Sequence, residues 1–446
     1  MTTGSLKLTV LGGGSFFTPS FVGTMCDRAE TFAGAEVRLH DLDSERVGLV
    51  KAFCERLTQA RGVPMTFVDA PDLARSLDGA DFVIATFRIG GPAALQLDET
   101  IPTRFGYFGN ETVGPGGIFM AIRTVPVVLD VAERMTRLCP RAWLVNYANP
   151  TNFVGDALRR AGHERSVSLC DGFICPPRDI GISLDIPHKK ILTRHAGINH
   201  CSWAYRAECD GRDLLAELLA IEPDALDANL SASGLLDEFG AARRRRWLDI
   251  FRIMGRYPAP AGHVEPYFYH DEWLAMQKQR RAEGRTYRGE HARKNWDRLR
   301  AVLADWDDAA AGEIARTHTG GHADLAIGVA DALATGSGEV FPVNVPHGGA
   351  VPGFPPETVL ELYCAVTRDG FTPEGSVPRF PDALLAQQNH LAAVERLTVS
   401  GILEKDRGKL LQAVCIHPFT KSVAVAEELF ETMWREERET LGTYWE

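Results

Sequence analysis

The chain has 446 residues, and 45% of them are hydrophobic. Because single hydrophobic cores usually stop growing at about 250–300 residues, a chain of this length predicts two domains. Its net charge of −11 argues against non-specific nucleic-acid binding, which depends on Lys and Arg neutralising phosphates. It has no apolar run of about 18 residues, which argues against a membrane-spanning helix, and the short polar stretch Met1–Lys7 argues against a signal peptide. Nine scattered cysteines indicate no disulfide framework, so we expect a reducing, cytoplasmic location.

The first half of the chain alternates apolar strands with helical segments. Leu6–Leu11 reads as a buried strand, the glycines Gly12–Gly14 follow it, and Pro19–Ala29 has helical spacing. This cadence predicts an α/β fold with a Rossmann-type doubly wound parallel sheet over residues 1–192. The further strands expected are Ala35–Asp41, Ala80–Thr86, Ala142–Tyr147 and Ser166–Cys170.

The second half loses this cadence and predicts a mainly helical α+β substrate domain over residues 193–446. Helices are expected in Leu214–Arg252, Asp271–Asp308 and Gln387–Trp434, and a small sheet from strands at Glu339–Asn344 and Thr358–Arg368. No long linker separates the halves, so we expect tight packing. The basic run in the first of these helical segments either pairs with nearby acids or reaches an anionic substrate group; it is Arg243–Arg246.

The first strand, the glycine run and the following helix form a candidate dinucleotide site. Backbone N–H groups in such a turn and the helix N-terminus bind a pyrophosphate. Phe17 replaces the third glycine of the usual fingerprint, so a ligand-free turn is the alternative. Asp41 ends the next strand, where an acid binds ribose hydroxyls and repels a 2′-phosphate, which favours NAD over NADP. The expected cofactor contacts are Gly12, Gly13, Gly14, Ser15, Phe16 and Asp41.

A series of short motifs runs through the chain, and each is unspecific by itself. They are GGGSFFTP from Gly12, FRIGG from Phe87, DETIP from Asp98, GNETVGPGG from Gly109, NYANPTN from Asn146, the pair Cys170-Asp171, GINH from Gly197, Gly320-Gly321, VNVP from Val343 and His417-Pro418. In this order and at these separations they resemble the NAD-dependent glycosidases of glycoside hydrolase family 4. That family shares its nucleotide domain with lactate and malate dehydrogenases.

The resemblance implies a divalent metal, usually manganese, bound by a cysteine and a histidine that correspond to Cys170 and His200. These ligands leave positions open for sugar oxygens, so His200 also faces the substrate. A buried thiol and a loop histidine are the alternatives.

The resemblance also assigns residues to the cofactor and the sugar. Arg88 and Asn149 correspond to cofactor contacts, and Asn149 also holds substrate hydroxyls near the metal. Glu111 corresponds to an acid in the substrate pocket. Asn152 and Asn199 are further candidates for hydroxyl ligands, although asparagine in a loop is often a turn former.

In that family NAD oxidises the sugar at C3, and a base then removes the C2 proton. The C1–O bond breaks by elimination. Water then adds to the resulting enone, and the hydride returns to C3. Asp171 corresponds to the proton donor for the leaving oxygen. The base is normally a tyrosine shortly after the paired glycines, and here that position holds Asp324. His322 is the competing base, and the structural alternative is that Asp324 caps a helix.

Two arginines that phospho-glycosidases use near the substrate are replaced, at Leu95 and in the stretch from His347. Their loss removes strong bidentate phosphate contacts. The departures resemble a related branch that acts on sulfoquinovosides, glucosides with a sulfonate on C6, and this is the predicted substrate. His347, Trp203 and Arg243–Arg246 are candidates for the sulfonate pocket. A 6-phospho-glucoside is the alternative, followed by uncharged or uronic sugars.

Two other functions fit the nucleotide half. One is a 2-hydroxy-acid dehydrogenase, which would form NADH with each turnover, and the other is an NAD sensor that has lost its base. The expected partner is a small glycoside with an anionic C6 group, and nucleic acid and membranes are not expected. The resemblance implies a homodimer or homotetramer.

Overall fold

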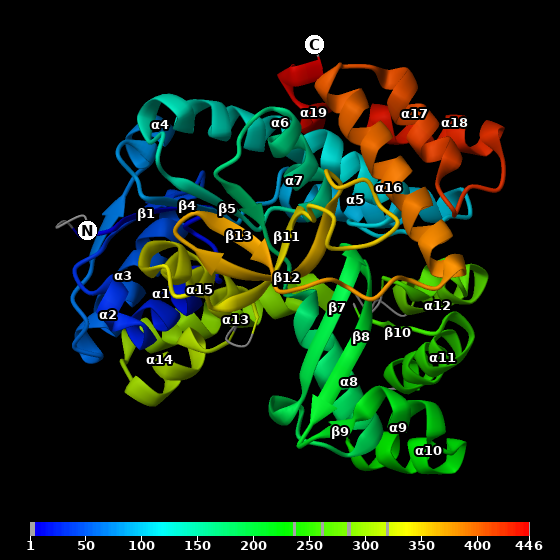
Figure 1. Ribbon diagram of the computed structural model, residues 1–446. Helices are drawn as coiled ribbons and strands as arrows, with labels where there is room; N and C mark the ends of the chain where they lie inside the picture. Colours follow the sequence, from blue (N-terminus) through cyan, green and yellow to red (C-terminus); the bar gives the residue numbers. More distant parts are fainter. Residues whose placement is uncertain (1–4, 235–237, 260–262, 283–286, 318–320, 446) are drawn as a thin grey trace.

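The computed structural model describes residues 5–234, 238–259, 263–282, 287–317 and 321–445, and Figure 1 shows helices around one central sheet. The strands are β1 Lys7–Leu11, β2 Glu36–His40, β3 Thr66–Asp69, β4 Phe82–Ala85, β5 Trp143–Asn146, β6 Ser166–Ser168, β7 Leu192–Ile198, β8 Cys201–Cys209, β9 Arg212–Asp213, β10 Tyr257–Pro258, β11 Val340–Pro346, β12 Val359–Thr367 and β13 Gly370–Pro373.

The helices follow the pattern expected from the apolar spacing in both halves. They are α1 Thr18–Asp27, α2 Ala29–Phe32, α3 Ser44–Ala60, α4 Leu73–Leu77, α5 Gly91–Arg104, α6 Gly114–Leu138, α7 Thr151–Arg160, α8 Cys175–Leu184, α9 Leu214–Ala220, α10 Pro223–Ala232, α11 Glu238–Met254, α12 His270–Ala282, α13 Tyr287–Ala304, α14 Asp308–Ala315, α15 His322–Thr335, α16 Asp382–Leu403, α17 Arg407–Ile416, α18 Val423–Glu436 and α19 Arg438–Leu441.

The first six strands form the predicted doubly wound sheet. They pair in parallel in the order β3-β2-β1-β4-β5-β6, so the direction of winding reverses between β1 and β4. Ligands of such sheets bind outside the carboxyl ends of the strands at this reversal. The predicted site residues of this half follow β1, β2, β4, β5 and β6, so the sheet gathers them at one edge.

The same sheet continues into the second half of the chain. β6 pairs antiparallel with β11, and the order then runs through β12, β7, β8 and β10. The two strands predicted there are confirmed as β11 and β12, but they extend the nucleotide sheet instead of forming a separate small one. The hairpin of β7 and β8 was not predicted. It begins at Leu192, where the sequence places the domain boundary; the division into two domains stays a prediction.

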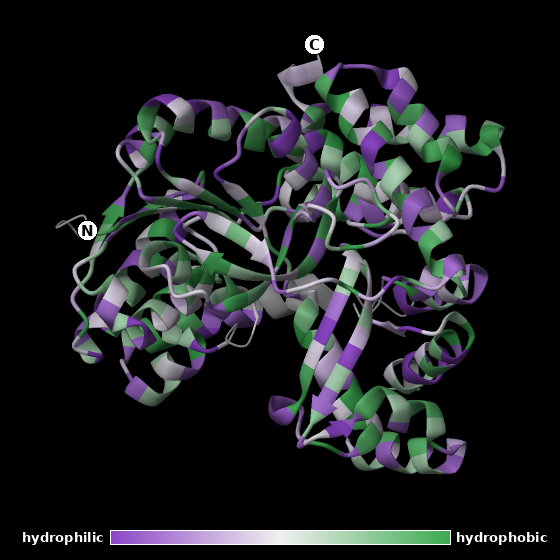
Figure 2. Cartoon of the chain, in the orientation of Figure 1, coloured by the Kyte–Doolittle hydropathy of each residue, from purple (hydrophilic) through white to green (hydrophobic). Residues whose placement is uncertain are grey.

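Apolar residues gather on the central strands and on the helix faces that cover them (Figure 2). Within the described residues α6 is the one helix long and apolar enough to cross a membrane, but 78% of that apolar stretch is buried inside the protein. It is therefore a core helix. Arg123 on α6 pairs with Asp98 of α5 at 2.6 Å and with Glu437 after α18, which ties the C-terminal helices to the nucleotide half.

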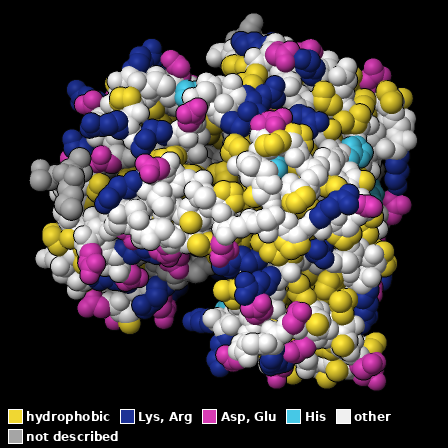
Figure 3. Space-filling view, viewed as in Figure 1, with side chains coloured by type: hydrophobic (Ala, Val, Ile, Leu, Met, Phe, Trp, Pro, Cys, Tyr) yellow, Lys and Arg dark blue, Asp and Glu magenta, His cyan; other side chains and the backbone are white. Residues whose placement is uncertain are grey.

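Charges of both signs are interspersed over the face shown in Figure 3, so that face carries no large field of one sign. A notch on this face separates the lobe around α1, α2 and α14 from the lobe around α9 and α10. The run Arg243–Arg246 pairs with acids, as the first of the two interpretations expected: Arg244 with Asp179, Arg245 with Asp227 at 2.7 Å, Arg246 with Glu272 at 3.3 Å, and Arg243 with Glu265 at 3.9 Å.

Candidate active site

The glycine turn after β1 is packed too closely for side chains. Gly12 has a φ of +87°, and a Cβ there would lie 2.7 Å from the Thr86 carbonyl oxygen. A Cβ on Gly13 would lie 2.8 Å from the Cα of Leu39. The turn therefore needs glycine at both positions, and it leads directly into α1, as the dinucleotide prediction requires.

Asp41 lies beside this turn. Its carboxylate accepts hydrogen bonds from the Gly14 N–H at 3.0 Å and the Asp43 N–H at 3.1 Å. Ser15 accepts from the Phe17 N–H at 3.2 Å, and the ring of Phe16 packs edge-on against Trp296. The residues predicted to contact NAD at this end of the sheet are thus close together.

Arg88 and Glu111 form an ion pair at the same edge of the sheet. Arg88 follows β4, and Glu111 precedes α6. A Cβ on Gly117, in the first turn of α6, would lie 2.5 Å from the Thr112 carbonyl carbon, so only glycine lets the helix start this close to the loop that carries Glu111. The side chain of Glu111 is buried, and that of Arg88 is partly exposed.

Asn149 lies in the loop between β5 and α7. Its side-chain oxygen is buried and accepts no hydrogen bond from any residue that the structure describes. An unsatisfied buried polar atom is costly, so such an atom in a loop at the ligand edge fits a contact to a bound molecule. This agrees with the predicted contact of Asn149 to cofactor and substrate.

Cys170 and His200 meet, as the sequence predicted. Cys170 follows β6 and His200 lies in the turn between β7 and β8 with a φ of +63°, and the Sγ to Nε2 distance is 3.5 Å. Both residues are buried. Burial raises the pKa of the Cys170 thiol well above its ordinary value, and the charges of Glu361 and Asp171 add to this effect.

The geometry of this pair fits one shared divalent ion. Metal bonds of about 2.0–2.3 Å to sulfur and nitrogen place two ligand atoms of one ion at about the separation observed here. The ring of His263 stacks on His200, with centroids 4.5 Å apart. The described residues contain no cluster of three or more His, Cys, Asp or Glu side chains suited to a metal.

Two further carboxylates approach the pair. Asp171 adjoins Cys170, and its Oδ2 lies 3.8 Å from where a Cβ on Gly321 would be. α15 starts directly after Gly321, and Asp324 in its first turn accepts a hydrogen bond from the Thr24 hydroxyl at 2.9 Å. Burial raises the pKa of Tyr147 well above 10, and the charges of Asp171, Cys170 and Asp324 add to this effect. The side chain of His322 lies outside the described part.

Two other predicted ligands, Asn199 and Asn152, make hydrogen bonds within the protein, and the side-chain oxygen of Asn152 is buried without a partner among the described residues. Asn199 accepts from the Thr151 hydroxyl at 2.6 Å and donates to Glu361 at 3.1 Å. Asn152 donates to the Val359 carbonyl at 3.2 Å and to a Glu395 carboxylate oxygen at 3.0 Å. The amides therefore link the loops around the site, and their contacts to a sugar stay a prediction.

His347 and Trp203 also have structural roles. His347 is fully buried; its Nε2 lies 2.9 Å from the Pro355 carbonyl, and its Nδ1 accepts from the N–H groups of Gly349 and Val351. Trp203 is fully buried with its ring edge-on to Phe268. Both ring nitrogens of His347 are therefore engaged by the backbone, and a contact of Trp203 to a sulfonate stays a prediction.

The sequence analysis missed Glu361, which hydrogen-bonds to the hairpin that presents His200. The sequence does contain an indication of this residue, because Glu361 is the one acid in the apolar strand VLELYCAVT. A charged side chain in a buried strand is costly unless it is paired and hydrogen-bonded.

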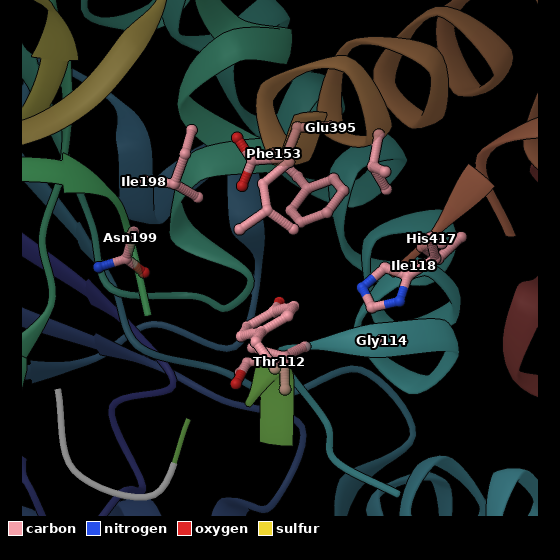
Figure 4. Close-up of a pocket in the computed structure, with 12 residues that line it drawn as sticks. Thr112, Gly114, Ile118, Phe153, Ile198, Asn199, Glu395 and His417 are labelled. Carbon is pink, nitrogen blue, oxygen red and sulfur yellow. The ribbon is translucent and has the colours of Figure 1, made fainter. Parts of the chain in front are cut away.

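A small cavity lies beside the turn that carries His200, since Asn199 lines it (Figure 4). Its volume is about 30 Å³, enough for water but not for a glycoside. Glu395 of α16 and His417 also line it. Burial raises the pKa of Glu395 to about 8 and lowers the pKa of His417 to about 3, so both groups are neutral at pH 7.

Sequence profiles of two domains cover most of the chain. The family 4 glycosyl hydrolase profile matches residues 7–181, and the profile of the family 4 glycosyl hydrolase C-terminal domain matches residues 195–420. The chain belongs to the family 4 glycosyl hydrolases. The resemblance inferred from the motifs is thereby confirmed, and so is the prediction that the chain is a glycosidase.

This family 4 glycosyl hydrolase is similar to phospho-glucosidases over nearly its whole length. The 6-phospho-alpha-glucosidase 1 of Lacticaseibacillus paracasei is 28% identical over 444 residues, which cover 96% of each chain. The 6-phospho-beta-glucosidase of Escherichia coli is 27% identical over 439 residues, covering 96% of this chain and 94% of the relative. Relatives of both anomeric types are thus similar to almost the same degree.

Solved structures show the same fold. The 6-phospho-beta-glucosidase of Thermotoga maritima, determined with manganese, NAD+ and glucose-6-phosphate, has a TM-score of 0.78 at 22% identity and covers 98% of this chain and 99% of its own. The lactate dehydrogenase of Eimeria maxima, determined with NADH and oxamate, has a TM-score of 0.52 at 13% identity and covers 92% of this chain and 98% of its own. The predicted Rossmann-type fold class is confirmed.

The raised pKa of Glu395 predicts that the stability of this family 4 glycosyl hydrolase decreases as the pH rises from 4.5 to about 8. Between its ordinary value of 4.5 and about 8, Glu395 is protonated in the folded protein and ionised in the unfolded one. Its contribution is therefore complete below pH 4.5 and is lost as the pH rises through 8, at about 1.4 kcal/mol per pH unit. In Glu395→Gln the melting temperature should fall less between pH 5 and pH 8 than in the wild type.

The matched control is Glu404→Gln, because Glu404 is exposed at the end of the same helix. Its melting curve should follow the wild type at every pH. Parallel pH profiles for Glu395→Gln and the wild type would contradict the assignment of a buried, protonated carboxyl.

Proposed function

We propose that this chain is an NAD-dependent 6-phospho-glucosidase that cleaves its substrate by transient oxidation at C3. The observation that carries the proposal is the buried Cys170–His200 pair, 3.5 Å apart, beside Asp171 in a family 4 chain. A two-carboxylate glycosidase needs no such pair.

NAD and a manganese ion are the proposed cofactors, since the Thermotoga maritima structure contains both. The glycine turn with Asp41 fits the dinucleotide, and Cys170 with His200 fits the ion. When bound, NAD supplies reversible hydride removal at C3, and the ion supplies charge that stabilises negative oxygen on the sugar.

Three side chains of the protein then act on the sugar. Asp171 donates a proton to the leaving oxygen, and Asp324 removes the C2 proton that the C3 ketone has acidified. Asn149 orients the sugar hydroxyls through its side-chain oxygen, which has no partner among the described residues. A carboxylate replaces the family's phenol as the base.

A 6-phosphate is the proposed C6 group, in place of the sulfonate that the sequence favoured. The relatives from Lacticaseibacillus and Escherichia are phospho-glucosidases. The sulfonate candidates were His347, Trp203 and Arg243–Arg246; His347 and Trp203 are buried, and the arginines pair with acids. Leu95 stands where those enzymes are expected to carry an arginine, so phosphate recognition here depends on other donors. A cytoplasmic location, where NAD is available, and a homo-oligomeric state remain part of this proposal.

The assay uses the intact enzyme with NAD, Mn²⁺ and nitrophenyl glucosides that carry either phosphate or sulfonate on C6. We expect nitrophenol release from a 6-phospho-glucoside without net NADH, because the hydride returns to C3. Charcoal treatment that removes NAD should abolish release, and added NAD should restore it. NADH formed in step with turnover would instead indicate a dehydrogenase, and preference for the sulfonate would restore the sulfoquinovoside interpretation.

Replacing the proposed base should reduce proton transfer at C2. Asp324→Asn is expected to lower kcat by about 10²–10⁴-fold, the usual contribution of a positioned base. It should also slow exchange of a C2 deuterium label with water. Asp331→Asn is the matched control, because Asp331 lies on the same helix but pairs with Arg28 at 2.5 Å. Retained exchange in Asp324→Asn, together with its loss in His322→Asn, would assign the base to His322.

A further inference from the structure

Glu361 is a carboxylate buried in the middle of the sheet, with only 2% of its surface exposed. On β12 it lies opposite Gly197 of β7 on one side and Asn344 of β11 on the other. A charge in such a place is costly unless it is paired and hydrogen-bonded. The residues around Glu361 therefore have to supply the hydrogen bonds that stabilise its charge.

The hairpin that presents His200 supplies three hydrogen bonds to this carboxylate. His195 Nε2 lies 3.3 Å from Oε1 of Glu361. Asn199 Nδ2 donates to Oε2 at 3.1 Å, and the Ser202 hydroxyl donates to the same oxygen at 3.3 Å. Asn199 precedes His200 directly, so the carboxylate anchors the turn whose positive φ aims the imidazole at Cys170.

Glu361 is charged at neutral pH. Burial acts to raise its pKa, but the hydrogen bonds from His195 and Asn199 lower it below the ordinary value. Interactions of this kind are stronger in the protein interior than in water.

We propose that Glu361 is a positioning residue that supplies the buried negative charge needed for a divalent cation at the Cys170–His200 pair. The inference rests on the proposed function for the cation itself. Groups behind metal ligands orient them and tune the affinity of the site for the metal. Here the hydrogen bond through Asn199 orients His200, and the charge of Glu361 attracts the cation.

The charge balance favours this role. Binding of a dication displaces the Cys170 proton to solvent, so the pair gains one net positive charge. Without Glu361 that charge would be buried beside a neutral imidazole. With Glu361 it is compensated by a carboxylate that the sheet holds in place through three hydrogen bonds.

The test is a titration of the NAD-loaded full-length protein with Mn²⁺ alone at pH 7, followed by calorimetry and by the electron paramagnetic resonance signal of free Mn²⁺. Glu361→Gln keeps an acceptor for Asn199 but removes the charge, and we expect its Mn²⁺ affinity to fall by about 10–100-fold. Glu361→Asp keeps the charge and should retain most of the affinity. The matched control is Glu395→Gln, because a pKa of about 8 already keeps Glu395 neutral at pH 7, and it should bind as the wild type does.

The opposite pattern would overturn the inference: unchanged affinity in Glu361→Gln, or a loss in folded Glu361→Asp as large as that expected for the glutamine variant. Circular dichroism and melting temperature establish that each variant is folded. If Glu361→Gln does not fold, Glu361→Asp alone still decides, because a loss of affinity with the charge retained contradicts the role. A wild type that binds no Mn²⁺ would overturn the proposed function as well, whereas normal wild-type binding with an unaffected Glu361→Gln would overturn only this inference.

Discussion

The approach of the Cys170 thiol to the His200 imidazole is the interaction on which the candidate site depends. The two residues come from different halves of the chain: Cys170 ends the parallel sheet after β6, and His200 turns the β7–β8 hairpin. They meet because β11 and β12 lie between these strands and continue the sheet across both halves. If the second half formed a separate sheet, no continuous sheet would hold Cys170 and His200 at a fixed separation.

The remaining polar groups follow from this meeting point. Parallel strands deliver the glycine turn, the Arg88–Glu111 pair and Asn149 to one edge, where a dinucleotide and a sugar can lie together. Asp171 adjoins Cys170 on the same loop, and α15, which carries Asp324 in its first turn, begins beside it, since a Cβ on Gly321 would lie 3.6 Å from the Cβ of Asp171. Behind the pair, the sheet holds a buried carboxylate that is hydrogen-bonded to the hairpin. Burying a charge of this kind costs free energy of folding. Its position near two potential metal ligands is consistent with a functional role.

The sequence predicts the contacts that depend on chain order and fails on those that depend on side-chain direction. The glycine turn with Asp41 was expected from motif spacing and the Cys170–His200 pair from the family resemblance, and the structure brings each set together. Asn152 and Asn199 were candidates for hydroxyl ligands, and the structure gives their amides hydrogen bonds to Glu395 and Glu361, which an asparagine in a sequence does not reveal.

The continuity of the sheet was also beyond the sequence pattern. β7 and β8 mix polar and apolar residues without the uninterrupted apolar run of the first strands, and their pairing with distant β12 is a long-range contact that local spacing does not encode. Glu361 was detectable in principle as a lone acid in an apolar strand. Its partners, however, lie about 160 residues away along the chain, at His195, Asn199 and Ser202.

The most direct measurement of the central claim is the absorption spectrum of the protein loaded with Co²⁺, a spectroscopic substitute for Mn²⁺. If Cys170 and His200 hold one ion, the wild type will show a thiolate-to-cobalt charge-transfer band in the near ultraviolet, and Cys170→Ser will lack it while remaining folded. A band of equal strength in Cys170→Ser, or no band in the wild type with Co²⁺ bound, would contradict the account.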